Sequence, residues 1–253
     1  MQSEMIPVTQ SGWRMGLGNL LRRELKQWFG TNSWLMQALF WGLILGGLIF
    51  MVTGDTSVAV EERLATGVAI YSIMGSIFPA IVIIIYSTGA ILEERERGTA
   101  AWVLSKPVSR TSFILAKLIG GVIAFGVSLV LIPGFIVYAI LNFGVGALSL
   151  GSYLLGLGPM MLWYMFIHFL CICLGAFFNE AGPVAGVPSI SLFFVSAFDT
   201  SGIGAYTPWT LSFVTRNLMQ GLPVTSITPV LATLVILTVL VVLAVWRFGK
   251  EEF

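Results

Sequence analysis

The sequence predicts an all-α integral membrane protein, with six transmembrane helices in a single domain over residues 1–253. Of its 253 residues, 57% are apolar and only 10% are charged, and the mean hydropathy is +0.94. Soluble domains have ~45–50% apolar and ~25% charged residues. The charges are separated by long charge-free segments, and the apolar–polar alternation of barrel strands is absent. Two cysteines and a net charge of +1 also exclude a disulfide-stabilised scaffold and a nucleic-acid binder.

The charge-free segments locate the spans. Residues 27–54, 64–92, 118–179, 181–198 and 217–246 contain no Lys, Arg, Asp or Glu. Because one span needs ~20 apolar residues, the longest segment holds two spans and each of the others holds one. The predicted helices are Trp34–Val52, Gly67–Leu92, Phe113–Leu141, Ser152–Phe178, Val184–Phe198 and Ile227–Arg247. Pro133 is expected to kink the third, which a membrane bundle tolerates.

Lys and Arg predict the orientation. With a cytoplasmic N-terminus, the cytoplasmic side carries eleven of the 13 basic residues, and the opposite side carries only Arg63 and Arg216. This positive-inside asymmetry places both termini in the cytoplasm. The first ten residues lack the apolar core of a signal peptide. The expected location is the inner membrane of a prokaryote.

Residues 13–29 are predicted to form an amphipathic elbow helix. Leucines and Trp28 recur at helical spacing on one side, and basic residues occupy the other. Such a helix lies in the membrane interface with its basic face toward anionic headgroups. It either anchors the chain in the membrane or transmits motion into the first span. The polar residues of interest are Arg22, Arg23, Glu24 and Lys26.

The cytoplasmic loop 93–110 has the densest charge in the chain. Gly98 is expected to end the second span, and Thr99 to cap a short helix over residues 100–105 that ends at Pro107. Ser109 is expected to cap the third span. The short helix presents Trp102 and Leu104, which suits a protein partner better than water. The alternative is a loop that lies on the membrane with Trp102 among the headgroups.

The outer loop 199–226 contains a further helical signal. Thr207-Pro208 is typical of a helix start, and Gly221 with Pro223 of a stop. The preceding span is short, ~22 Å at 1.5 Å per residue against a ~30 Å hydrocarbon core. The segment is therefore expected to be a broken or re-entrant hairpin, with a plain surface helix as the alternative.

The loop motif resembles the ABC-2 type permease family, and within it the compact multicopper-enzyme-maturation (nitrous-oxide-reductase accessory) permeases. The resemblance rests on Glu94-Arg95-Glu96-Arg97-Gly98-Thr99, Leu104-Ser105-Lys106-Pro107-Val108-Ser109-Arg110 and Lys117. It implies that residues 100–105 are a coupling helix seated on a separate ATPase subunit. It also implies a dimer of permease chains with two ATPase chains. The residues implicated in coupling are Glu94, Glu96, Gly98, Thr99, Trp102, Leu104, Pro107, Arg110 and Lys117.

The chain itself is not expected to be an enzyme. It has no G-x-x-x-x-G-K-[ST] phosphate loop, so ATP and Mg²⁺ are expected on the partner subunit. No predicted span carries a central acidic residue, which argues against an ion-coupled transporter. The predicted function is ATP-driven export or flipping of a substrate. The alternatives are a mechanical transmitter that serves an extracytoplasmic metalloenzyme maturation factor, and a membrane scaffold without an ATPase.

One intramembrane stripe carries soft ligand atoms. Met161, Met165, His168 and Cys171 follow one another at helical spacing in the fourth span. Thioether, thiol and imidazole groups suit Cu(I), but Met and Cys are also ordinary packing residues. A histidine satisfied by a neighbouring hydroxyl or carbonyl is the favoured interpretation, and no metal site is predicted. Cys171 and Cys173 are expected to pack as free thiols.

Overall fold

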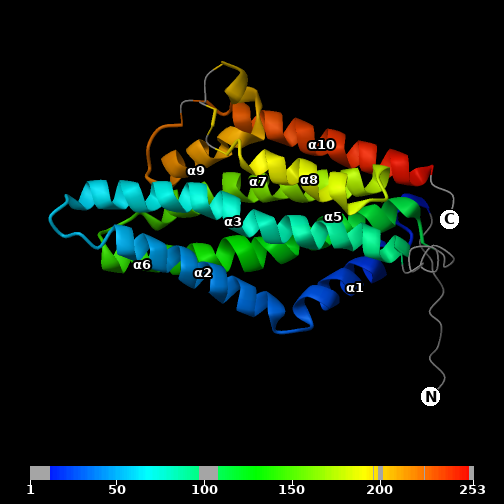
Figure 1. Ribbon diagram of the computed structural model, residues 1–253, viewed down its shortest axis with the longest axis horizontal. Coiled ribbons are helices and arrows are strands. Elements are labelled where there is room, and N and C mark those ends of the chain that lie inside the picture. Colours follow the sequence, from blue (N-terminus) through cyan, green and yellow to red (C-terminus); the bar gives the residue numbers. More distant parts are fainter. Residues whose placement is uncertain (1–11, 97–107, 196, 199–201, 225, 251–253) are drawn as a thin grey trace.

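The computed structural model describes residues 12–96, 108–195, 197–198, 202–224 and 226–250, and every regular element within them is helical. The α-helices form an elongated bundle (Figure 1). Their bounds are α1 Leu17–Phe29, α2 Ser33–Val52, α3 Val60–Glu96, α5 Arg110–Phe125, α6 Ile132–Gly144, α7 Leu150–Phe177, α8 Ala181–Leu192, α9 Leu211–Met219 and α10 Thr228–Gly249. The shorter helical turns are η1 Gly12–Arg14, η2 Gly126–Leu131, η3 Gly202–Tyr206 and η4 Pro208–Thr210.

In the described part of the chain, five helical segments are long and apolar enough to cross a membrane. They are Ser33–Val52, Val60–Glu94, Arg110–Gly144, Leu150–Phe177 and Thr228–Gly249. Each contains one of the predicted spans or matches it within a few residues. The third is α5, η2 and α6 in continuous succession, and η2 is a π-helical turn that ends at Leu131, two residues before Pro133. Proline lacks the backbone N–H of an α-helix, and the helix departs from α-geometry at this point.

The predicted span 184–198 differs from the structure. Among the described residues of this segment, only those of α8 are helical. Its 12 residues reach ~18 Å, well short of a ~30 Å hydrocarbon core. The absence of charge showed that the segment is compatible with lipid, but it did not show that one helix continues through it. A sixth full span therefore stays a prediction.

The chain nevertheless returns along the bundle between α7 and α10. The Arg247 guanidinium lies 6.0 Å from the ring of Phe177, so α7 and α10 end near each other. At the other end, the Gln220 amide donates to the Ala65 carbonyl at 3.1 Å, close to the start of α3. Two helices, α8 and α9, make this return in place of a single span. We call the end where α3 ends and α5 begins the loop end, and the opposite one the far end.

Helix α9 is part of the bundle and not a surface helix. Leu211, Thr215 and Met219 are fully buried, and a Cβ atom on Gly156 of α7 would lie 2.3 Å from Met219. The predicted start and stop are present, because Thr207 precedes η4 and Gly221 adopts φ +69° after α9. The Thr207 hydroxyl donates to the Gly204 carbonyl at 2.9 Å and does not cap the helix.

Helix α7 lies at the centre and contacts α3, α9 and α10 (Figure 1). Its link to α3 compensates for a proline. Pro79 within α3 has no N–H to donate to the Gly75 carbonyl, and the Tyr164 hydroxyl of α7 donates to that carbonyl instead. The neighbouring Trp163 indole donates to the Ser76 carbonyl at 2.8 Å. In a membrane an unsatisfied carbonyl costs several kcal/mol, so these bonds allow a proline in mid-helix.

Small residues permit close packing between α2 and α6. Cβ atoms on Gly42 and Gly46 of α2 would lie 2.4 Å from Ile136 and Ile140 of α6, whereas Gly47 faces open space. Glycines at the contact thus let α2 and α6 approach closely.

Candidate functional site

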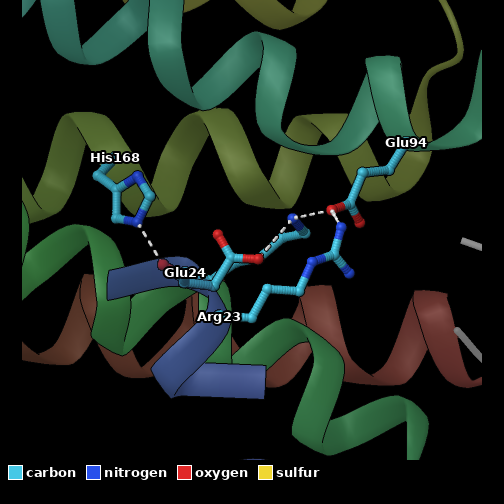
Figure 2. Close-up of polar contacts among 5 residues, drawn as sticks. Arg23, Glu24, Glu94 and His168 are labelled. Atoms are coloured by element: carbon cyan, nitrogen blue, oxygen red, sulfur yellow. Dashed lines mark hydrogen bonds and ion pairs between the residues drawn. The ribbon is translucent and has the colours of Figure 1, made fainter. Parts of the chain in front are cut away.

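Four charged side chains meet at the loop end. The Lys117 ammonium of α5 lies 3.3 Å from Glu24 Oε1 of α1 and 3.2 Å from Glu94 Oε1 of α3. The Arg23 guanidinium of α1 lies 3.1 Å from the same Glu94 oxygen. Figure 2 shows Arg23 and Glu24 of α1 and Glu94 of α3 converging, with dashed lines for the ion pairs. We call this set the ion-pair cluster; it joins the elbow helix to the ends of the second and third spans.

The burial of each side chain indicates which of these contacts contributes most to stability. The Lys117 side chain is 3% exposed and both carboxylates are largely buried, whereas Arg23 is 43% exposed. An exposed pair contributes ~0–1 kcal/mol, but removal of one partner from a buried pair costs ~3–5 kcal/mol because an uncompensated charge remains. Lys117 is therefore the centre of the cluster.

The elbow helix reaches Lys117 because α5 carries glycine where the two helices cross. A Cβ atom on Gly120 would lie 3.0 Å from the Cβ atom of Glu24. Leu20 and Trp28 are buried against the protein, and the Trp28 ring packs edge-on against Tyr86 and Phe125. The predicted apolar face is therefore real, but it packs substantially on neighbouring helices and not on lipid alone.

His168 of α7 lies beside the ion-pair cluster (Figure 2). Its Nδ1 lies 2.7 Å from the Ser87 hydroxyl, and its Nε2 lies 3.2 Å from the Lys117 carbonyl. With the proton on Nε2, the ring donates to this carbonyl and accepts from Ser87, which satisfies both nitrogens. The structure thus supplies the hydroxyl and the carbonyl that the favoured interpretation requires.

The structure also describes the space around His168 and the state of the two cysteines. A Cβ atom on Gly121 would lie 2.2 Å from His168 Nε2, so a glycine is needed for this contact. Cys171 and Cys173 are buried free thiols, as predicted. Among the described residues, no group of three His, Cys, Asp or Glu side chains is arranged to hold a metal ion.

The residues that follow loop 97–107 make a second set of contacts. The Ser109 hydroxyl accepts from the Ser112 N–H at 3.0 Å, which confirms the predicted cap of α5. The Ser109 N–H donates to the Met15 carbonyl at 3.0 Å, and the Ser112 hydroxyl donates to the Trp13 carbonyl at 2.7 Å. Arg110 donates to the Gly249 carbonyl at 2.9 Å, at the end of α10. This exit contact set joins α5 to the chain before α1 and to the end of α10.

The structure brings together only some of the predicted coupling residues. Glu94, Lys117, Arg23 and Glu24 form the cluster, and Arg110 belongs to the exit contact set. Arg22, Lys26 and Glu96 are exposed outside it. Gly98, Thr99, Trp102, Leu104, Pro107 and the helix 100–105 lie outside the described residues. Sequence reasoning missed Ser87, because a serine within an apolar run carries no distinguishing signal.

An apolar cavity lies at the far end of the bundle. It has a volume of about 690 Å³ between α7, α9 and α10, and its lining is apolar. Pro159, Val214, Leu218 and Val230 are among the residues that line it. Its volume is within the ~300–1,000 Å³ of typical ligand pockets.

Comparison with known proteins identifies a family that the sequence matches. Residues 27–212, about three quarters of the chain, match a family model described as ABC-2 family transporter protein. The matched region begins within α1 and ends within α9, so it includes the ion-pair cluster apart from Arg23 and Glu24. No curated protein matches the chain.

Proposed function

The chain belongs to the ABC-2 family of transporter proteins, and we propose that it couples ATP hydrolysis on a separate subunit to rearrangement of its own helices. As a member of this family it is a membrane subunit of an ABC transporter and not itself the ATPase. On this proposal, two such chains assemble with two ATPase subunits in the inner membrane. Loop 97–107 faces the cytoplasm, where the positive-inside rule places it.

The observation that supports coupling is that loop 97–107 is attached on both sides. Before it, Glu94 is held by Lys117 and Arg23; after it, Ser109 and Arg110 are bonded to the Met15 and Gly249 carbonyls. A displacement applied to the loop is therefore transmitted to α1, α3, α5 and α10 together. An unattached loop would absorb the same displacement locally.

This chain's own residues have distinct tasks in that mechanism. Trp102 and Leu104 supply the apolar contact with the ATPase subunit, and Gly98, Thr99 and Pro107 set the bounds of the short helix. Lys117 and Glu94 transmit the displacement to the second and third spans, and Arg23 and Glu24 transmit it to the elbow. ATP and Mg²⁺ supply the chemistry on the partner.

The far-end cavity favours export or flipping of an apolar or amphipathic molecule over force transmission alone. A cavity of about 690 Å³ with an apolar lining can accommodate the apolar part of a ligand, since burial of apolar surface is favourable. A subunit that only transmits force needs no such volume between α7, α9 and α10.

The test is a double substitution in the loop, Trp102→Asp with Leu104→Asp. A buried charge at an apolar contact is costly, so this variant is expected to insert into the membrane but to lose the ATPase during co-purification. The matched control, Trp102→Phe with Leu104→Met, keeps the apolar contact and should retain the ATPase. Survival of the complex in the Asp variant would overturn the coupling-helix assignment.

A further inference from the structure

We propose that the far-end cavity binds a hydrocarbon chain of a membrane lipid, which enters sideways from the bilayer between α7 and α10. The inference rests on the proposed function only in taking this lipid as the transported substrate. Helix α9 and the start of α10 lie beside α7 (Figure 1), and the cavity of about 690 Å³ lies between these three helices.

The chemistry of the lining selects the hydrocarbon chain. All described residues that line the cavity are glycine, proline, valine, leucine or isoleucine, so none of their side chains is charged, aromatic or able to form a hydrogen bond. Most ligand pockets contain a few polar groups that orient the ligand. A sugar, a nucleotide or a peptide backbone would lose its hydrogen bonds to water here without replacement, which is costly. Water itself does not fill an apolar cavity.

The cavity is continuous with the lipid-facing surface. Two of its lining residues, Gly158 of α7 and Ile227 just before α10, are exposed. About one turn from each of them, Leu155 is 66% exposed and Leu231 is 54% exposed. Lipid tails are as apolar as these side chains. A chain can therefore move from the bilayer past Gly158 and Ile227 into the cavity without crossing a polar barrier formed by these residues.

The depth of the cavity also fits an acyl chain. Helix α7 has 28 residues and is ~42 Å long, which matches a bilayer of ~40–45 Å when the helix runs along the membrane normal. Its first residue, Leu150, then lies at the membrane surface, and Gly158 and Leu162 lie ~12–18 Å below that surface. The headgroup region takes up only the outer ~5–8 Å. The cavity is thus at the level of the hydrocarbon chains of one leaflet.

The experiment crosslinks lipid to the full chain in phosphatidylcholine liposomes. A small fraction of the phosphatidylcholine carries a photoactivatable diazirine in the middle of one acyl chain, and the adducts are located by peptide mass spectrometry. Val214 of α9 is only 3% exposed and yet lines the cavity with Leu218. Adducts on these two residues therefore report a chain inside the cavity. We expect them in the wild type, and none when the diazirine is on the headgroup.

Gly158→Phe should abolish these adducts. A Cβ atom at Gly158 meets nothing within 4 Å, so the ring can occupy the cavity without a clash. The matched control is Gly47→Phe in α2, where a Cβ atom also meets nothing within 4 Å; it should be labelled as the wild type is.

Three outcomes would overturn the lipid site: no adducts on Val214 and Leu218 in the wild type, labelling of these residues in Gly158→Phe, or labelling by the headgroup probe. Chain-to-chain adducts from a photoreactive amino acid at position 230 would also overturn it, because a second copy would then occupy the cavity. The labelling needs no ATPase subunit, so its failure would leave the coupling through loop 97–107 untouched. Conversely, the variant Trp102→Asp with Leu104→Asp should be labelled as the wild type is.

Discussion

The two ends of the bundle are held together by different forces. At the loop end, Lys117, Glu24 and Glu94 form directional contacts of 3.2–3.3 Å in a largely buried setting. At the far end, α7, α9 and α10 surround an apolar cavity through residues such as Val214 and Leu218. Buried ion pairs allow one geometry and are costly to break, whereas apolar contacts are non-directional. The loop end is thus suited to transmit a displacement, and the far end to rearrange in response.

The strongest test of this contrast is Lys117→Met, which leaves Glu24 and Glu94 without their buried partner. We expect a loss of ~3–5 kcal/mol in the free energy of unfolding, measured by denaturation of the purified chain in detergent. Lys117→Arg retains the charge and should lose much less. Addition of Glu24→Gln to the Met variant should restore part of the loss. A Met variant as stable as the wild type would show that the ion-pair cluster does not hold the loop end together.

A smaller effect is expected from Gly121→Ala, because the new Cβ atom would lie 2.2 Å from His168 Nε2. The imidazole must move, which breaks its bond to the Lys117 carbonyl and strains the packing, at a cost of ~1–3 kcal/mol. Gly126→Ala is the control, since its Cβ atom would meet Met161 at an ordinary 3.4 Å. Equal stability of the two variants would contradict a rigid contact between His168 and α5.

The smallest effect is expected at the far end, from Leu218→Ala. Leu218 is only half-buried beside an existing cavity, so its truncation should cost below ~1 kcal/mol, compared with ~2–5 kcal/mol for a fully buried leucine. Leu118→Ala, at a fully buried position of α5, provides the comparison. If Leu218→Ala were the more destabilising of the two, the far end would be the more tightly packed end.

Most of the spans could be predicted from the charge pattern alone, because lipid tolerates few charged side chains over the ~20 residues that a span needs. Five predicted spans correspond to helices whose bounds differ by a few residues, except that α3 begins seven residues before the predicted start. At 184–198 the described helix α8 is shorter than the predicted one, since the charge pattern carries no information about where a helix is interrupted. The return of the chain by α8 and α9 depends on their packing against α3 and α7.

The candidate site was predictable as separate residues but not as an arrangement. Arg23, Glu24, Glu94 and Lys117 were identified from composition, spacing and resemblance. The pairing of Lys117 with the Glu24 and Glu94 carboxylates was not predicted, because these residues lie 93 and 23 positions away in the sequence. The same holds for His168, whose hydroxyl partner Ser87 is 81 residues away.

The sequence by itself determined the membrane environment, the approximate position of five spans and the concentration of charge around residues 93–110. These features follow from the solvent, because the transfer of charge into lipid is unfavourable in any fold. Only the tertiary structure decided which helices are joined and how. Lys117 of α5 reaches Glu24 because Gly120 lets α1 approach α5 closely. The Gly75 carbonyl, which loses its helical partner at Pro79, accepts a hydrogen bond from the Tyr164 hydroxyl of α7. Such contacts depend on distances between helices, which a pattern along one chain does not contain.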